Sequence, residues 1–248
     1  MLPPILTQVG RFPVVWIPAH PDNVWQTDDG LPKEGVVIHT MGGTLAGCDA
    51  WFRNPSAVAS ANFGISKQGV IHQYVELRGR APYANGVAQD NIRKVKAMAP
   101  DVKALSEKYH WASQNKWTWS IEHEDNGATT QITDWPLMFE ASTVLCATLL
   151  RDLPPERRRT FGHYQFDGID RPYCPGWTTE TWRAYDAEVM RLVGEMEGAP
   201  TPPAPVEHPD MAEVKRLMDS IYNATHQAAQ DSADLFAEMR RLFPDGGI

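Results

Sequence analysis

Among the histidines and cysteines, whose side chains bind transition metals, three residues each stand in a distinctive local setting. His39 follows a β-branched apolar run, His163 stands between a glycine and a tyrosine, and Cys174 precedes Pro-Gly. Catalytic zinc sites take three protein ligands from His, Cys or carboxylate and leave a fourth position for water. Each residue alone has a plainer interpretation, because a histidine after a strand is usually structural and a cysteine before Pro-Gly carries little information. As a set, the three residues match a catalytic zinc site.

Hydrolysis at a metal also needs a group that transfers protons, and a carboxylate suits this task. Glu122 and Glu124 lie two residues apart in segment 117–124, which alternates bulky or β-branched residues with polar ones. Residues two apart on a strand project to the same face, so both glutamates are expected on one face and His123 on the other. The simpler alternative is that either glutamate pairs with an arginine at the sheet edge.

Strands and helices alternate along the part of the chain that must position these residues. Strand patterns are found at residues 35–39, in a hairpin of 61–65 and 70–75 around the turn 66–69, and at 117–124. Helical patterns are found at 90–110, interrupted at Pro100, then from a cap at Asp134 to Pro154 with Pro136 in the first turn, and at 178–193. We therefore expect two short helices around Pro100 and two longer helices after it.

The composition of the chain and its proline-rich segment predict one large domain followed by a smaller extension. The chain has 248 residues, 42% of them hydrophobic and 22% charged, which is enough for one full-size core. We expect a catalytic domain at 1–197, a proline-rich linker at 198–209 and a helical tail at 210–248. Apolar residues in the tail recur at steps of four and three, as in a coiled-coil seam, so we expect it to mediate self-association or targeting.

Charge, cysteine content and hydropathy exclude several classes of partner. The net charge of -8 provides no basic stripe for phosphates, so we expect no nucleic-acid partner. The three cysteines are too few for a disulfide framework, which favours synthesis in a reducing compartment. The first residues lack the basic and apolar regions of a signal peptide, and no run reaches the roughly 18 apolar residues of a membrane span. We therefore expect synthesis in the cytoplasm without a signal peptide.

Four motifs in the same order resemble the zinc amidases that include phage lysozyme-type amidases and the peptidoglycan recognition proteins. The motifs are Val-Val-Ile-His-Thr at 36–40, Ser-Ala-Asn-Phe-Gly-Ile-Ser-Lys-Gln-Gly at 60–69, Ser-Ile-Glu at 120–122, and Gly-His with Cys-Pro-Gly at 162–163 and 174–176. Each motif alone has low specificity, whereas four in order are far more specific. The resemblance covers about residues 35–177.

This resemblance implies a fold, a cofactor and a reaction. The fold would be α/β, a mixed central β-sheet flanked by helices on both faces, with the helical C-terminal extension added. Zn²⁺ would be held by His39, His163 and Cys174 in a groove along one sheet edge. The reaction would be hydrolysis of the amide bond between N-acetylmuramic acid and L-alanine in bacterial peptidoglycan. Glu122, at the Ile-Glu position, would be the general base, with Glu124 as the second candidate.

One departure from the family pattern concerns the oxyanion. Many relatives carry a lysine two residues before the last zinc ligand, where this chain has Pro172, and the nearest cation is Arg171. We expect Arg171 or a backbone amide to stabilise the oxyanion instead. The departure leaves the zinc ligands intact.

Several alternatives remain open at this point. We expect a phage endolysin that acts on the cell wall after release, and a cytosolic amidase that recycles muropeptides is its close alternative. A non-catalytic peptidoglycan-binding module is disfavoured because all three ligands are retained, and a purely structural metal would need a fourth ligand such as His72. The other histidines are expected to be structural or at the surface, and Trp51, Tyr83, Trp117 and Trp119 to form core or cleft wall.

Overall fold

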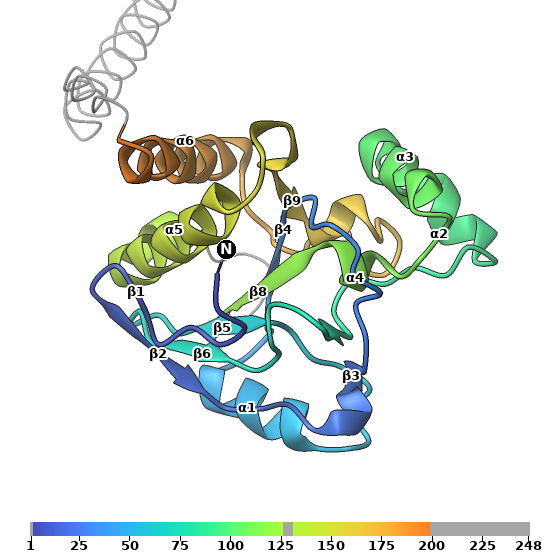
Figure 1. Ribbon diagram of the computed structural model, residues 1–248, viewed down its shortest axis with the longest axis horizontal. Coiled ribbons are helices and arrows are strands. Elements are labelled where there is room, and N and C mark those ends of the chain that lie inside the picture. Colours follow the sequence, from blue (N-terminus) through green and yellow to red (C-terminus); the bar gives the residue numbers. More distant parts are fainter. Residues whose placement is uncertain (1, 126–130, 199–248) are drawn as a thin grey trace, which may run out of the picture. The chain divides into compact units, whose positions relative to one another are not determined.

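The computed structural model describes residues 2–125 and 131–198, which include all the predicted site residues (Figure 1). Except for Gly198, the predicted linker at 198–209 and the whole predicted tail at 210–248 lie outside the described residues. Self-association through the tail therefore stays a prediction.

A seven-stranded mixed sheet forms the centre of the fold, in the order β1-β2-β6-β5-β8-β4-β9. Two neighbouring pairs, β1–β2 and β5–β6, are antiparallel, and the other four neighbouring pairs are parallel. In that order the strands span Gln8–Val9, Phe12–Trp16, Ile71–Gln73, Phe63–Ile65, Trp119–His123, Val36–Thr40 and Thr160–Gly162. A separate antiparallel pair joins β3 (Val24–Trp25) to β7 (Ala81–Pro82). The predicted α/β fold with a mixed central sheet is confirmed.

Strand β4 lies inside the sheet because its sequence is apolar on both faces. Val36, Val37 and Ile38 have no exposed surface. A strand that is covered on both faces shows a continuous β-branched run rather than strict alternation. Its neighbours β8 and β9 both run parallel to it, so the carboxyl ends of all three strands meet at one edge. His39 stands at that edge.

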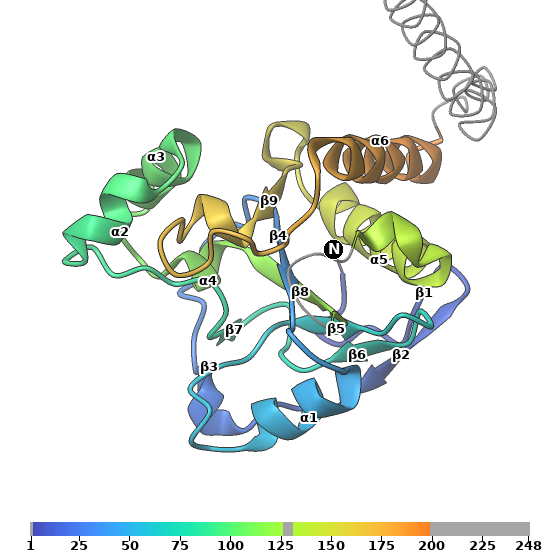
Figure 2. The same ribbon diagram turned by 180° about the vertical axis from the view of Figure 1, so that it is seen from behind.

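Helices cover both faces of the sheet, as predicted. Figure 1 shows α5 with α6 beside it on one side of the sheet and α1 on the other, and the view from behind in Figure 2 shows the same arrangement. Ile38 packs in the core cluster that includes α5 residues, whereas Val37 packs in a different cluster that includes α3 residues. Within residues 2–125 and 131–198, helices α1 to α6 span Leu45–Arg53, Ile92–Ala97, Pro100–Lys108, Gln114–Trp117, Pro136–Arg151 and Thr179–Met196.

Two of the helix predictions are confirmed in detail. Helices α2 and α3 are separated at Met98 and Ala99, and Pro100 occupies the first turn of α3, where its missing N–H costs no hydrogen bond. Helix α6 is capped by Thr178, whose hydroxyl accepts a hydrogen bond from the Thr181 amide. The sequence signals at both positions are local.

Two local predictions are wrong. Asp134 does not cap α5, because it ends a 3-10 turn (η2, Ile132–Asp134) and Trp135 stands at the cap position. Trp117 is not in the predicted strand but ends α4, where it is fully buried and stacks on Tyr109. The aromatic alternation at 117–119 therefore reflects burial on two different elements. Across the described residues, no helix has the length and apolar character needed to span a membrane.

Candidate metal centre

The first predicted ligand lies on the face of the sheet opposite α5. Side chains alternate along β4, so His39 shares the face of Val37 while Ile38 points toward α5. The parallel register pairs His39 with Glu122 on β8. Both residues therefore project from neighbouring strands to the same side of the sheet.

The other two predicted ligands come from the segment that follows the edge strand β9. His163 begins a 3-10 turn (η4, His163–Gln165) directly after β9. A β-carbon at Gly162 would collide with the ring of Tyr164, which explains why glycine precedes the histidine. Cys174 is brought back beside this turn because its carbonyl accepts a hydrogen bond from the Tyr164 amide at 3.0 Å.

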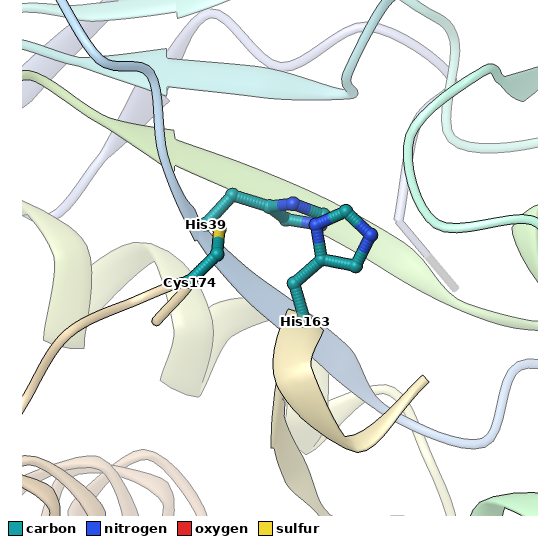
Figure 3. Close-up of side chains that lie close together, drawn as sticks. All are labelled: His39, His163 and Cys174. Carbon is teal, nitrogen blue, oxygen red and sulfur yellow. The ribbon is translucent and has the colours of Figure 1, made fainter. Parts of the chain in front are cut away.

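The structure brings the three predicted ligands together. The side chains of His39, His163 and Cys174 point toward one another, and each offers one ligand atom within 4.8 Å of the others (Figure 3). The two imidazole centroids lie 4.3 Å apart. The Cys174 sulfur also accepts a hydrogen bond from the Thr40 amide at 3.4 Å. Residues separated by more than 130 positions thus form one potential metal site.

The hydrogen bonding and protonation of these three side chains are compatible with binding a metal ion. Nε2 of His39 is buried and has no hydrogen-bond partner among the described residues. Burial holds the pKa of His39 well below its usual range and lowers that of His163 to about 4, so both imidazoles are neutral and can donate a lone pair. Burial also raises the pKa of the Cys174 thiol to about 12, so a thiolate here requires a compensating cation.

The two candidate carboxylates have different surroundings. Glu122 lines the same cleft as the three ligands, with Oε1 3.8 Å from Nδ1 of His39 and with Oε2 buried and lacking a hydrogen-bond partner among the described residues. Burial raises the pKa of Glu122 to about 7, and the nearby charge of Arg171 opposes the shift. Glu124 lies beyond the last residue of β8, and its Oε2 accepts a hydrogen bond from the Lys67 amide at 3.3 Å. Because β8 ends before Glu124, the alternation of side chains along a strand does not apply to it, and it is not expected to share the face of Glu122.

Arg171 lies in the cleft with the ligands. It is an exposed residue of the cleft wall, and its positive charge lowers the pKa of His39, His163 and Glu122. One guanidinium nitrogen donates to the Asp170 carbonyl at 3.1 Å. A cation held at this position can stabilise negative charge that develops in the cleft.

The cleft has a volume of about 670 Å³, and Trp51 lines it, as expected, but the helix that carries Trp51 was not predicted from the sequence. One wall of the cleft is the loop 40–44 with this helix, α1, whose residue Trp51 is 52% exposed. Thr44 caps α1 by accepting a hydrogen bond from the Gly47 amide, and Leu45, Cys48 and Phe52 are buried at helical spacing. A threonine cap followed by this spacing was the available signal. Tyr83 also lines the cleft, whereas Trp117 and Trp119 are core residues.

The opposite face of β8 holds His123, which was expected to be structural. Its Nδ1 lies 2.9 Å from the His39 carbonyl oxygen and its Nε2 lies 2.7 Å from the Ser142 hydroxyl. Burial lowers the pKa of His123 to about 4, so the ring is neutral. His72 pairs with Asp49 at 2.9 Å and does not belong to the group of three ligands, so it supplies no fourth ligand there.

The chain is similar in sequence to known amidases. The family described as N-acetylmuramoyl-L-alanine amidase matches residues 29–177, which is more than half of the chain. N-acetylmuramoyl-L-alanine amidase A of Achromobacter lyticus is 26% identical over 182 residues, covering 65% of this chain and 85% of that protein.

Solved structures are also similar to this chain, and one of the following two has a TM-score above 0.5. Staphylococcus aureus hydrolase AmiA, solved with its ligand, has a TM-score of 0.51 at 14% identity, covering 82% of this chain and 100% of that one. A mutant endolysin from Bacillus subtilis has a TM-score of 0.47 at 14% identity, covering 72% of this chain and 99% of that one. At such identities the likeness to AmiA supports the fold alone. The match over residues 29–177 decides the family, and the chain belongs to the N-acetylmuramoyl-L-alanine amidases.

Proposed function

We propose that the chain hydrolyses the amide bond between N-acetylmuramic acid and L-alanine of peptidoglycan at a zinc centre formed by His39, His163 and Cys174. The observation that carries the proposal is the meeting of these three ligand atoms within 4.8 Å, in a cleft that Glu122 also lines. Membership of the amidase family supplies the reaction class.

The donor set supports zinc as the metal. Two neutral imidazoles and one thiolate suit a tetrahedral ion of borderline softness, and three protein ligands leave one position open, as catalytic zinc sites require. When bound, zinc would polarise the scissile carbonyl and lower the pKa of a water molecule. The 670 Å³ cleft in front of the three ligands leaves room for an extended substrate.

Glu122 is proposed as the general base. Its carboxylate faces the cleft beside His39, and its Oε2 has no hydrogen-bond partner among the described residues. A base of this kind takes a proton from the attacking water and returns one to the nitrogen of the leaving L-alanine as the C–N bond breaks. Glu124 is the weaker candidate because its carboxylate accepts a hydrogen bond from a backbone amide of the hairpin turn.

Arg171 is proposed to stabilise the oxyanion. Amide hydrolysis places negative charge on the carbonyl oxygen before the C–N bond breaks, and a nearby cation lowers the energy of that state. Arg171 is the cleft residue whose positive charge acts on His39, His163 and Glu122 together. The role matches that of the lysine which many zinc amidases carry at the position of Pro172.

The central test compares the wild-type chain with Cys174→Ser, using Cys146→Ala as a matched control for loss of a cysteine. Cys146 is buried in α5 and lies outside the ligand group. We expect the wild type and the control to bind one equivalent of zinc and to release L-alanine amino termini from purified peptidoglycan. Cys174→Ser should abolish both zinc binding and the release of L-alanine amino termini. Chelation should remove the zinc and stop the release, and added zinc should restore only the chelated wild type.

Two outcomes of this test would contradict the proposal. A chelated wild type that still releases L-alanine amino termini would exclude the metal centre. A fully zinc-loaded wild type that binds peptidoglycan without releasing anything would favour a non-catalytic binding module. Thermal unfolding provides an independent readout, because zinc that binds only the folded state at about 100 times its Kd stabilises by about 2.7 kcal/mol.

We further propose that intact cell wall is the substrate, as expected of a phage endolysin, rather than soluble muropeptides. Support comes from the exposed aromatic side chains Trp51 and Tyr173 that line the cleft, since aromatic faces can pack on the sugar rings of a long polymer. Rates on purified sacculi and on soluble muropeptides should differ in favour of sacculi. The opposite ratio would indicate a recycling amidase.

The predicted tail at 210–248 is proposed to mediate self-association, because its apolar spacing is that of a coiled-coil seam. Sedimentation of the full chain and of a chain ending at residue 203 tests this. Equal monomeric masses would exclude it.

A further inference from the structure

A hydrogen-bonded chain connects the first ligand to both helices on the far side of the sheet. Nδ1 of His123 lies 2.9 Å from the His39 carbonyl oxygen, and its Nε2 lies 2.7 Å from Oγ of Ser142 on α5. Oγ of Ser142 in turn lies 2.8 Å from the Tyr185 hydroxyl on α6. All three side chains are at most 1% exposed. The backbone of His39 is thereby tied to two helices through the core.

Donor and acceptor chemistry fixes the direction of this chain. The His39 carbonyl can only accept, so Nδ1 of His123 carries the hydrogen. Nε2 of the neutral ring then accepts, and Ser142 must donate to it. Because Ser142 has a single hydroxyl hydrogen, the bond from Tyr185 must arrive with Tyr185 as the donor. Every hydrogen in this series of hydrogen bonds points toward β4, the strand that carries His39. The ring of His123 therefore has one preferred tautomer and orientation.

The same ring also contacts the segment that carries the third ligand. Trp177 lies three residues after Cys174, and its ring meets the His123 ring in an edge contact with centroids 5.5 Å apart. Trp177 packs further on Tyr185, with centroids 5.1 Å apart. His123 is therefore placed between the strand that carries His39 and the loop that carries Cys174.

We propose that His123 is a positioning residue of the metal centre, because its Nδ1–H holds the His39 carbonyl and so fixes the direction of the His39 ring. Nε2 of the His39 ring has no hydrogen-bond partner among the described residues, which leaves it able to bind a metal while His123 holds the His39 backbone. Partners that orient metal ligands are typically worth about 10- to 100-fold in metal affinity. The inference rests on the proposed ligand role of His39.

Two substitutions separate the two ends of the His123 ring. Asparagine places its amide nitrogen near the position of Nδ1, so His123→Asn keeps the donor to His39 and loses the bond to Ser142. Glutamine places its amide near Nε2, so His123→Gln keeps the bond to Ser142 and loses the donor to His39. Tyr185→Phe is the matched control, because it removes only the far end of the chain.

The test measures the zinc dissociation constant of each full-length variant by competition with a chromophoric chelator, and the urea midpoint of each metal-free variant. We expect His123→Gln to bind zinc about 10- to 100-fold more weakly than the wild type. His123→Asn and Tyr185→Phe should stay within about threefold of the wild type, even though both lower the urea midpoint. A merely structural residue would instead lower zinc affinity in proportion to stability in all three variants.

The outcomes distinguish this inference from the proposed function. A wild type that binds no zinc would overturn the metal centre itself. A wild type that binds zinc, with His123→Gln and His123→Asn equal in affinity, would overturn only the positioning role. If His123→Gln does not fold, His123→Leu combined with Ser142→Ala removes the histidine and serine groups together and leaves neither unpaired. Wild-type zinc affinity in that double variant would also overturn the inference.

Discussion

His39 and His123 are equally buried on neighbouring strands, yet their ring nitrogens have opposite surroundings. Each residue is 1% exposed. Both nitrogens of His123 have protein partners, whereas Nε2 of His39 has none among the described residues. Burial alone therefore does not distinguish a metal ligand from a structural histidine. The hydrogen bonds that the protein leaves unmade do distinguish them, because an unpaired buried polar atom costs stability unless something else binds it.

The same contrast holds for the two faces of β8. Glu122 points into the cleft with an oxygen that has no hydrogen-bond partner among the described residues, while Ile121 and His123 point toward α5 into a closed core. The cleft face of β8 is arranged for chemistry and leaves a buried polar atom unpaired within the described part of the chain, which costs stability. The face toward α5 is a closed core that adds stability. Apart from His123, whose Nδ1 reaches the His39 carbonyl, substitutions that keep to one face should therefore change one property and spare the other.

The largest effect is expected for Glu122→Gln on the cleft face. Loss of a general base should lower kcat by about 10²- to 10⁴-fold, because the amide cannot accept the proton. Zinc content and the urea midpoint should not fall, since glutamine has the shape of glutamate and removes a charge that is costly to bury. Steady-state kinetics and metal analysis check this. Glu124→Gln is the control, and an equal loss of kcat in both variants would contradict the assignment of the base.

The second effect concerns the helix face, where Ile121→Ala removes a fully buried side chain. The cavity should lower the free energy of unfolding by about 2–5 kcal/mol, as measured by urea denaturation. The folded fraction should keep its zinc affinity and its kcat. If Ile121→Ala lowered kcat as strongly as Glu122→Gln, the separation of the two faces would be wrong.

Much of this site could be predicted from the sequence because its signals are local. The β-branched run before His39, the Gly-His pair and the Cys-Pro-Gly turn each describe a few neighbouring residues, and the structure brings all three ligands together. Glycine at position 162 is explained by the ring of Tyr164, which lies only two residues away. The mixed sheet also follows from short strand patterns.

The features that were missed depend on where elements end and on contacts distant in sequence. Alternation placed Glu124 beside Glu122, but β8 ends at His123 and the pattern stops there. Trp117 was assigned to the same strand, although burial in a helix produces the same apolar signal. The two hydrogen-bond partners of His123 are His39, which lies 84 residues earlier, and Ser142, which lies 19 residues later, and nothing near His123 in the sequence indicates them.

The third prediction concerns charge inside the cleft. Arg171→Ala should lower kcat by about 10²-fold, which is the usual cost of one lost oxyanion donor, and should leave zinc content unchanged. Arg171→Lys should recover part of the loss because it keeps the positive charge. Both variants are assayed by release of L-alanine amino termini. Wild-type turnover in Arg171→Ala would assign the oxyanion to a backbone amide instead.

The smallest effect is expected for a residue that lines the cleft but is not a proposed metal ligand or catalytic group. Trp51 on α1 is 52% exposed and lines the cleft without belonging to the ligand group, so its ring is available to pack on a substrate. Trp51→Ala should raise KM about 3- to 10-fold, since aromatic packing is worth roughly 0.5–1.5 kcal/mol, and should leave kcat and zinc content unchanged. Ile92→Ala is the control, because Ile92 is 62% exposed and does not line the cleft. A lower kcat in Trp51→Ala would mean that the wall also orients the scissile bond, and the contrast between faces would then extend from the strands to helix α1.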